Sequence, residues 1–194
     1  TRRDFVKASS ALTAGALLAR PYIANAAKDD KVIKIGLVGI GGRGSGAAAQ
    51  AMNADPNVAL TAIGDLFEDR IKLRSRILKA RGRDKYKVID SGVDVVILTT
   101  PPAFRPQHLE YAIEKGVHCF FEKPVAVDAI GVRKVIELAK KAKEKNLSFM
   151  SGFCWRHHKP KQEVFGRILD GAIGNINSMY STYNGGEVWK KKRE

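Results

Sequence analysis

Short apolar runs alternate with amphipathic stretches along most of the chain. Five of these runs are expected to form strands: Val32–Gly39, Val58–Gly64, Val93–Thr99, Val117–Phe121 and Leu147–Phe153. Val93–Thr99 is nearly continuously apolar, as expected for a central parallel strand covered on both faces. The stretches between them have helical composition or helical spacing of apolar residues: Ser45–Asn53, Glu68–Ala80, Phe104–Lys115 and Asp128–Lys145. This alternation predicts an α/β domain whose parallel strands are joined by right-handed helical crossovers.

Single residues mark the ends of two of these helices. Gly116 suits the position just after a helix, because glycine adopts a left-handed backbone without strain. Asp128 can cap the helix that reaches Lys145. The apolar positions of that helix recur at helical spacing and predict its buried face: Val132, Val135, Ile136, Ala139 and Ala142. Further along, we expect a helix over Lys161–Asp170 and a strand over Ile176–Tyr183.

The first residues are expected to form an export signal. Arg2 and Arg3 open the chain, the short apolar run Ala8–Ala19 follows, and Ala24–Ala26 supplies small residues at a cleavage-site spacing. The paired arginines resemble the twin-arginine signal, which serves the export of folded proteins. We therefore interpret residues 1–26 as a twin-arginine signal peptide, recognised by that export machinery, and expect a periplasmic or otherwise exported mature protein. An ordinary amphipathic amino-terminal helix is the alternative.

The net charge of the chain does not change the expected class of protein. The formal net charge is +14 over 194 residues. Much of it falls on predicted helix faces, without aromatic residues interleaved among the basic ones, so solvated faces are favoured over a nucleic-acid surface. No apolar run reaches the roughly 18 residues that a membrane span needs, so we expect no stable membrane insertion of the mature protein.

Two cysteines are present, Cys119 and Cys154. Their separation does not fit a metal motif. Buried free thiols are favoured for both, and the sequence leaves a disulfide open.

A glycine-rich loop directly follows the first predicted strand. Gly39-Ile40-Gly41-Gly42-Arg43-Gly44 matches the pattern G-x-G-x-x-G and opens a helix, which is the context of a dinucleotide-binding loop. Gly39 would permit the tight turn, Gly41 the approach of the backbone to a pyrophosphate, and Gly44 close packing of helix on strand. The helix N-terminus would offer N–H groups to the phosphates. Arg43 either contacts a phosphate or points to solvent.

An acidic residue completes this pattern. The second strand ends in Asp65, about 20 residues after the loop, the position that accepts hydrogen bonds from the adenosine ribose. Its carboxylate would repel a 2′-phosphate, so the sequence predicts NAD as the cofactor in preference to NADP. A glycine turn followed by a surface aspartate is the alternative.

Two further motifs follow predicted strands. Thr99-Thr100-Pro101-Pro102 ends the strand that begins at Val93, and Glu122-Lys123-Pro124 ends the strand that begins at Val117. Both would lie at the carboxyl ends of parallel strands, where open α/β sheets bind ligands. Together with the glycine loop, Asp65 and His108, these motifs resemble the Gfo/Idh/MocA family of oxidoreductases, and the resemblance covers essentially the whole mature chain.

The resemblance implies roles for several residues. Lys123, between Glu122 and Pro124, would be a buried catalytic lysine beside the nicotinamide that orients or polarises the reacting hydroxyl or carbonyl. A lysine in an ordinary surface turn is the alternative. Thr100 and Pro101 would line the cofactor, with Gly42 and Arg43 in the loop opposite.

Two other segments are less sharply assigned. His108 either faces the same cleft or packs under its helix. Arg156 resembles the family's arginine near the cleft. Adjacent His157 and His158 have no third ligand at useful spacing, so no metal site is expected.

The resemblance also sets the expected domains. Residues 27–153 would form an NAD(P)-binding Rossmann domain, and residues 154–194 the beginning of a truncated α+β substrate domain. The stretch from Asp65 to Val93 has room for one helix and a connector, so the third-strand region is expected to be shortened, with no third strand and with Arg81–Tyr86 as a junction. The family's catalytic Asp and His would lie beyond the last residue of this sequence.

These expectations lead to one function and two alternatives. The first is an NAD(P)-dependent oxidoreductase that acts on a hydroxyl-bearing carbon of a sugar, cyclitol or related polyol. The alternatives are an NAD-dependent glycosidase that uses transient oxidation, and a cofactor-binding but catalytically inactive fragment. Whether this chain alone is an enzyme stays open. Self-association stays open as well, since family members usually pair through the substrate domain.

Overall fold

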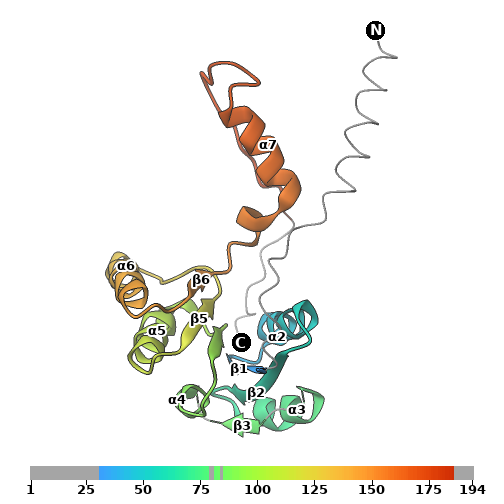
Figure 1. Ribbon diagram of the computed structural model, residues 1–194, viewed down its shortest axis with the longest axis vertical. Helices are drawn as coiled ribbons and strands as arrows, with labels where there is room; N and C mark the ends of the chain where they lie inside the picture. The colour runs from blue at the N-terminus through green and yellow to red at the C-terminus, as the bar shows by residue number, and fades with distance from the viewer. Residues whose placement is uncertain (1–30, 79–80, 84, 186–194) are drawn as a thin grey trace, which may run out of the picture. The chain divides into compact units, whose positions relative to one another are not determined.

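The computed structural model describes residues 31–78, 81–83 and 85–185 (Figure 1). The interpretation of residues 1–26 as an export signal therefore concerns residues outside the described part. The chain divides into two compact units, one ending at Ser151 and the other beginning at Gly152.

The first unit is built on one sheet of six strands in the order β3-β2-β1-β4-β5-β6. All neighbouring strands are parallel. Their bounds are β1 Ile33–Val38, β2 Val58–Gly64, β3 Arg81–Arg83, β4 Val95–Leu98, β5 His118–Phe121 and β6 Phe149–Ser151. The predicted Rossmann-like parallel α/β sheet is confirmed.

Helices cover both faces of this sheet, which is why its central strands are largely apolar on both faces. Figure 1 shows α2 and α3 on one face and α4, α5 and α6 on the other. Their bounds are α2 Gly42–Ala54, α3 Glu68–Leu78, α4 Lys85–Ile89, α5 Arg105–Glu114 and α6 Ala129–Glu144. Under α2 the core includes Ile35, Leu37 and Ile63, and under α5 and α6 it includes Leu98, Leu109 and Phe121.

The region after β2 corrects one expectation. A third strand does exist: β3 pairs in parallel with the end of β2, from Ala62↔Arg81 to Gly64↔Arg83. It is three residues long and α4, which follows it, is five. The expectation that this region lacks a third strand was therefore wrong, whereas the expectation that the region is shortened is confirmed. Three residues suffice because an edge strand needs only backbone hydrogen bonds to one neighbour.

Helix α6 confirms its cap and corrects its buried face. The Asp128 carboxylate accepts a hydrogen bond of 2.6 Å from the Gly131 amide. The buried positions are Val135, Leu138 and Ala142. Val132 is 39% exposed and Ile136 is 54% exposed. At 100° per residue the three buried positions span one narrow stripe, and the other apolar positions lie on its flanks.

The second unit contains one full helix, α7 (Lys159–Leu169), preceded by the short helix η2 (Cys154–His157). The Trp155 and Tyr183 rings lie 6.3 Å apart. The strand expected over Ile176–Tyr183 is absent, because no described segment pairs with it and a strand needs a partner for its backbone groups. In the described ranges, no helix is both long and apolar enough to cross a membrane.

Candidate cofactor-binding site

A cavity of about 720 Å³ lies at the carboxyl ends of β1, β2, β4 and β5. The order of the strands reverses between β1 and β4, so this is the topological switch point where doubly wound sheets bind ligands. The cavity brings together most of the residues singled out from the sequence: Gly39, Gly41, Arg43, Asp65, Thr100, Pro101, His108, Glu122 and Lys123.

The glycine loop has the steric requirements expected of it. Gly39 has a φ of +93°, and a Cβ there would lie 2.9 Å from the Thr100 amide nitrogen. A Cβ at Gly44, inside the first turn of α2, would collide with the Gly39 carbonyl oxygen. A Cβ at Gly41 would meet nothing within 4 Å. Gly39 and Gly44 therefore close the turn tightly, while Gly41, which lines the cavity, leaves room for a ligand beside the backbone.

Gly42 is the first residue of α2, and the amides of this first turn have no partners within the helix. No acidic side chain lies in that turn and no side chain caps it. The N-terminus of α2 at the cavity therefore carries the partial positive charge that suits a phosphate group.

Asp65 connects the glycine loop to the loop after β2. Its Oδ2 accepts a hydrogen bond of 2.8 Å from the Ile40 amide, and its Oδ1 accepts one of 3.1 Å from the Phe67 amide. A carboxylate has about four acceptor positions, so two remain for hydroxyl groups of a ligand. Asp65 thus holds the glycine loop against the loop after β2 and keeps acceptors directed at the cavity.

Arg43 lines the cavity and forms an ion pair that the sequence analysis did not foresee, and its contact with a phosphate stays a prediction. Its Nε donates a hydrogen bond of 2.8 Å to Oε1 of Glu122, and its Nη2 lies 2.5 Å from the same oxygen. The side chain of Glu122 is 8% exposed, whereas that of Arg43 is 53% exposed. This ion pair joins the start of α2 to the turn after β5, and both of its residues line the cavity.

Lys123 lies at the cavity but is exposed, so the expectation of a buried ammonium was wrong. The turn after β5 places Glu122 in the buried position and Lys123 at the rim. The Lys123–Pro124 peptide bond is cis. A lysine at the rim keeps its flexible side chain free to reach a ligand inside the cavity.

His108 satisfies both of its alternatives. It is 2% exposed in the middle of α5, and it also lines the cavity. Its Nδ1 lies 3.2 Å from Oγ1 of Thr100. The histidine therefore packs beneath its helix and orients the threonine that follows β4.

Arg105 is a residue that the sequence analysis missed. It lines the cavity and is 2% exposed, and its guanidinium donates hydrogen bonds to the backbone carbonyls of Thr100 and Pro124. Burial lowers its pKa from the ordinary value, and the negative charge of Glu122 partly offsets this. One signal was available: arginine stands in the first turn of α5, where the helix dipole disfavours a cation.

The remaining predicted residues lie away from the cavity or in the second unit. Arg156 belongs to η2, where its guanidinium lies 5.9 Å from the centre of the Phe153 ring, and its position beside the cofactor stays a prediction.

Cys119 is buried, and burial raises the pKa of its thiol to about 12. Cys154 is exposed, contrary to expectation, because it lies in a short surface helix; both thiols are free. His158 accepts a hydrogen bond from the Lys161 amide as the cap of α7.

The part of the chain that the structure describes contains no group of three or more His, Cys, Asp or Glu side chains that could hold a metal ion.

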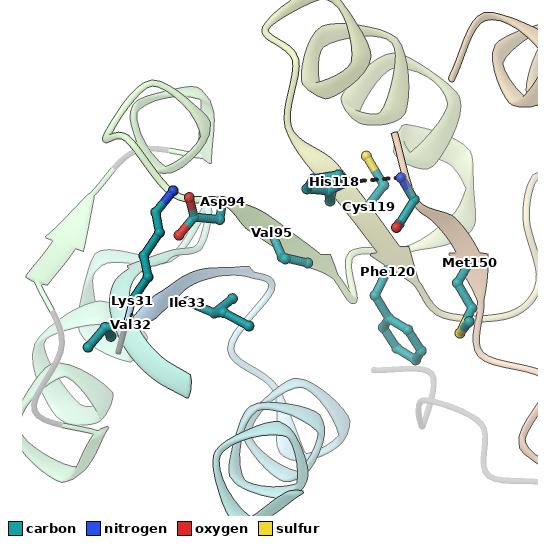
Figure 2. Close-up of a pocket in the computed structure, with 10 residues that line it drawn as sticks. Lys31, Val32, Ile33, Asp94, Val95, His118, Cys119, Phe120 and Met150 are labelled. Carbon is teal, nitrogen blue, oxygen red and sulfur yellow. Dashed lines mark hydrogen bonds between the residues drawn. The ribbon is translucent and has the colours of Figure 1, made fainter. Parts of the chain in front are cut away.

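A second cavity, of about 440 Å³, lies at the opposite, amino-terminal ends of β1, β4 and β5. Figure 2 shows Phe120 and Met150 side by side on its wall, in register on β5 and β6. Its Asp94 carboxylate already accepts a hydrogen bond of 2.7 Å from the Lys34 amide. This cavity is apolar and lies away from the glycine loop.

The strand, glycine loop and helix, the aspartate after the second strand and the cavity at the switch point define a dinucleotide-binding α/β domain. Comparison with known families agrees. Residues 33–153 match the Gfo/Idh/MocA oxidoreductase family, described as having an NAD-binding Rossmann fold, and the chain belongs to this family.

Individual relatives and solved structures match part of their length to this chain. The inositol 2-dehydrogenase/D-chiro-inositol 3-dehydrogenase of Lactiplantibacillus plantarum is 31% identical over 74% of this chain and 41% of its own length. A glycosyl hydrolase family 109 protein of Shewanella baltica is 26% identical, over 92% and 46% respectively. The structure of scyllo-inositol dehydrogenase from Lactobacillus casei with bound NAD(H) and scyllo-inositol has a TM-score of 0.66 at 25% identity, over 75% of this chain and 43% of that one. The chain spans less than half the length of each.

Proposed function

We propose that the protein is an NAD-dependent oxidoreductase that acts on a hydroxyl-bearing carbon of a sugar, cyclitol or related polyol. The observation that carries the proposal is the cavity at the switch point, with Asp65 after β2 and Lys123 after β5. Relatives named as inositol dehydrogenases support the class of substrate.

The residues of the cavity fit a dinucleotide. The amides at the start of α2 and the open space beside Gly41 suit the pyrophosphate, and Asp65 has acceptors left for ribose hydroxyls. When bound, the nicotinamide ring would supply the acceptor for a hydride from the substrate carbon.

The protein's own part in this reaction is to bind and orient the substrate. Lys123 would donate a hydrogen bond to the oxygen on the reacting carbon and so orient and polarise it, while the hydroxyl proton passes to solvent water as the carbonyl forms. Thr100 and Pro101, after β4, would form the wall against the nicotinamide half of the cofactor. Glu122, held by Arg43, anchors the turn that carries Lys123.

NAD is the proposed cofactor in preference to NADP. The Asp65 carboxylate lies where the ribose hydroxyls would bind, and a 2′-phosphate placed there would meet its negative charge.

Cofactor titrations test the proposal directly. NADH and NADPH would be titrated into the protein while the nicotinamide fluorescence is followed, and NADH formation would then be measured with a panel of cyclitols and sugars. Tighter binding of NADH and turnover of one panel member are expected. Failure to bind either cofactor would refute the proposal, whereas binding without any turnover would favour a cofactor-binding, inactive module.

The relative named as a glycosyl hydrolase family 109 protein favours one second candidate, a glycosidase that uses NAD for transient oxidation. Such an enzyme oxidises its substrate and then reduces it again, so NADH does not accumulate. Incubation with chromogenic glycosides separates the candidates: cleavage without net NADH supports the glycosidase, and net NADH without cleavage supports the dehydrogenase.

We also propose that residues 1–26 direct export by the twin-arginine route, so that the mature protein begins near Ala27 and carries its cofactor out of the cytoplasm. A cofactor that is scarce outside the cytoplasm must be loaded before transport, which requires export of the folded protein. Changing Arg2 and Arg3 together to Lys should trap the precursor in the cytoplasm, while Arg20→Lys should leave export intact. Normal processing of the double variant would refute this assignment.

A further inference from the structure

Arg105 is a buried cation in the wall of the cofactor cavity. It is 2% exposed, and its charge remains because a guanidinium is not deprotonated in proteins. No described residue accepts a hydrogen bond from its buried Nε. Its hydrogen bonds go to two backbone carbonyls, those of Thr100 and Pro124.

These two carbonyls belong to different loops that line the same cavity. Thr100 follows β4, and Pro124 ends the turn after β5 that begins with Glu122 and Lys123. A guanidinium is planar and has donors on both sides, so a single side chain can bridge two carbonyls at a set spacing. Arg105 therefore sets the separation between the loops.

The turn after β5 is held from its other end as well. Arg43, from α2, bonds to Glu122, and Arg105, from α5, bonds to the carbonyl of Pro124. Lys123 lies between these two anchored residues and faces the cavity. The backbone of Lys123 is thus restrained on both sides although its side chain is exposed.

A purely structural role is a poor explanation for this arrangement. Burying a charge without a directly bonded carboxylate costs more than filling the same space with an apolar side chain. The first turn of α5 also disfavours a cation. What the arginine provides and an apolar residue does not is the link between the two loops.

The loops in question border one half of the cavity. Asp65 and the glycine loop lie on the β1–β2 side, which binds adenosine in Rossmann domains, so the loops after β4 and β5 border the nicotinamide half. We propose that Arg105 is a positioning residue for the nicotinamide half of the cofactor: by linking Thr100 to Pro124 it holds the wall after β4 and the backbone of Lys123 at the spacing that the nicotinamide ring needs. The inference rests on the proposed binding of a nicotinamide dinucleotide.

Two ligands that differ only at the nicotinamide test the proposal. NADH and ADP-ribose would be titrated into the wild-type chain, Arg105→Met and Arg105→Lys. The matched control is Arg133→Met, which removes an exposed arginine of α6 in the same unit. Thermal unfolding of each variant would be measured in parallel.

In Arg105→Met, the affinity for NADH should fall about tenfold, since a small displacement of positioning groups is costly. The affinity for ADP-ribose should change by less than about twofold, because its proposed binding groups, Asp65 and the amides at the start of α2, do not bond to Arg105. The fluorescence of bound NADH should shift toward that of the free cofactor. Arg105→Lys, which keeps the charge but loses the planar fork, should show about a threefold fall for NADH alone. Arg133→Met should change neither affinity.

A structural role would give a different result. An equal fall for NADH and ADP-ribose in the variants, or no fall for either, would overturn the inference. If Arg105→Met does not fold, the ratio of the two affinities in Arg105→Lys decides, and an unchanged ratio would overturn it. If the wild-type chain binds neither NADH nor ADP-ribose, that result would instead overturn the proposed function, and the inference with it.

Discussion

Asp65→Ala tests the adenosine half of the site. The substitution removes a carboxylate that accepts hydrogen bonds from the Ile40 amide at 2.8 Å and from the Phe67 amide at 3.1 Å. It also removes the acceptors proposed for the ribose hydroxyls. Two separate effects are therefore expected, one on cofactor binding and one on folding.

The magnitudes follow from the contacts. A hydrogen bond to a charged group contributes about 1.5–3 kcal/mol, and since Asp65 is only partly buried the lower part of this range applies. A loss of about 1.5–2 kcal/mol corresponds to a fall of roughly ten- to thirtyfold in affinity for NADH. NADPH should lose less, because removing the carboxylate also removes its repulsion of the 2′-phosphate. The free energy of unfolding should fall by about 1–3 kcal/mol as two backbone amides lose their acceptor.

Fluorescence titration with NADH and NADPH measures the first effect, and denaturant unfolding measures the second. Asp65→Asn is the matched variant, since it keeps an acceptor oxygen and removes only the charge. Asp55→Ala is the control for stability: Asp55 accepts a bond of 2.8 Å from the Asn57 amide in a turn that does not line the cavity. A wild-type protein that prefers NADPH, or an Asp65→Ala variant with unchanged selectivity, would refute this reasoning.

Three further outcomes are expected. Gly44→Ala should lower the free energy of unfolding by about 1–3 kcal/mol in denaturant titration and weaken NADH binding, because its Cβ would collide with the Gly39 carbonyl. Leu109→Ala, at a position of α5 that is 0% exposed, should cost about 2–5 kcal/mol of unfolding free energy and leave the NADH to NADPH preference unchanged. A hydrogen bond from Lys115 holds the pKa of Asp90 below its ordinary value of 3.8, so this carboxylate stabilises the fold above that pH and stops doing so as the pH falls through its lowered pKa. Asp90→Asn should therefore be less stable than wild type at pH 7 and equally stable once the pH lies below the lowered pKa of Asp90, which unfolding titrations across pH would detect.

Where local pattern and tertiary environment agree, sequence was sufficient. The strand predicted over Val58–Gly64 has those bounds in the structure, and Asp128 caps α6 as expected. Both follow from short-range rules, namely a continuous apolar run and a side chain that bonds to an amide three residues away. The steric demand at Gly39 and Gly44 belongs to the same class, because the pattern itself specifies a tight strand-to-helix turn.

The errors arose where a partner far along the chain decides the structure. Arg81–Arg83 has no strand pattern of its own and forms β3 only because the edge of β2 offers hydrogen bonds. Ile176–Tyr183 has a strand pattern but finds no partner among the described segments. Backbone pairing, not local composition, determined both outcomes.

The sequence by itself determined the class of this protein: a parallel α/β domain with a glycine loop, an aspartate after the second strand and motifs after two later strands. These features depend on residue type and spacing, which a linear pattern carries. Only the tertiary structure decided that Arg43 bonds to Glu122, that Lys123 lies at the rim, and that Arg105 bridges two loops. The physical reason is that each of these depends on which side chain takes the limited buried space where strand ends converge. That choice is made by packing between elements distant in the chain, and no local pattern records it.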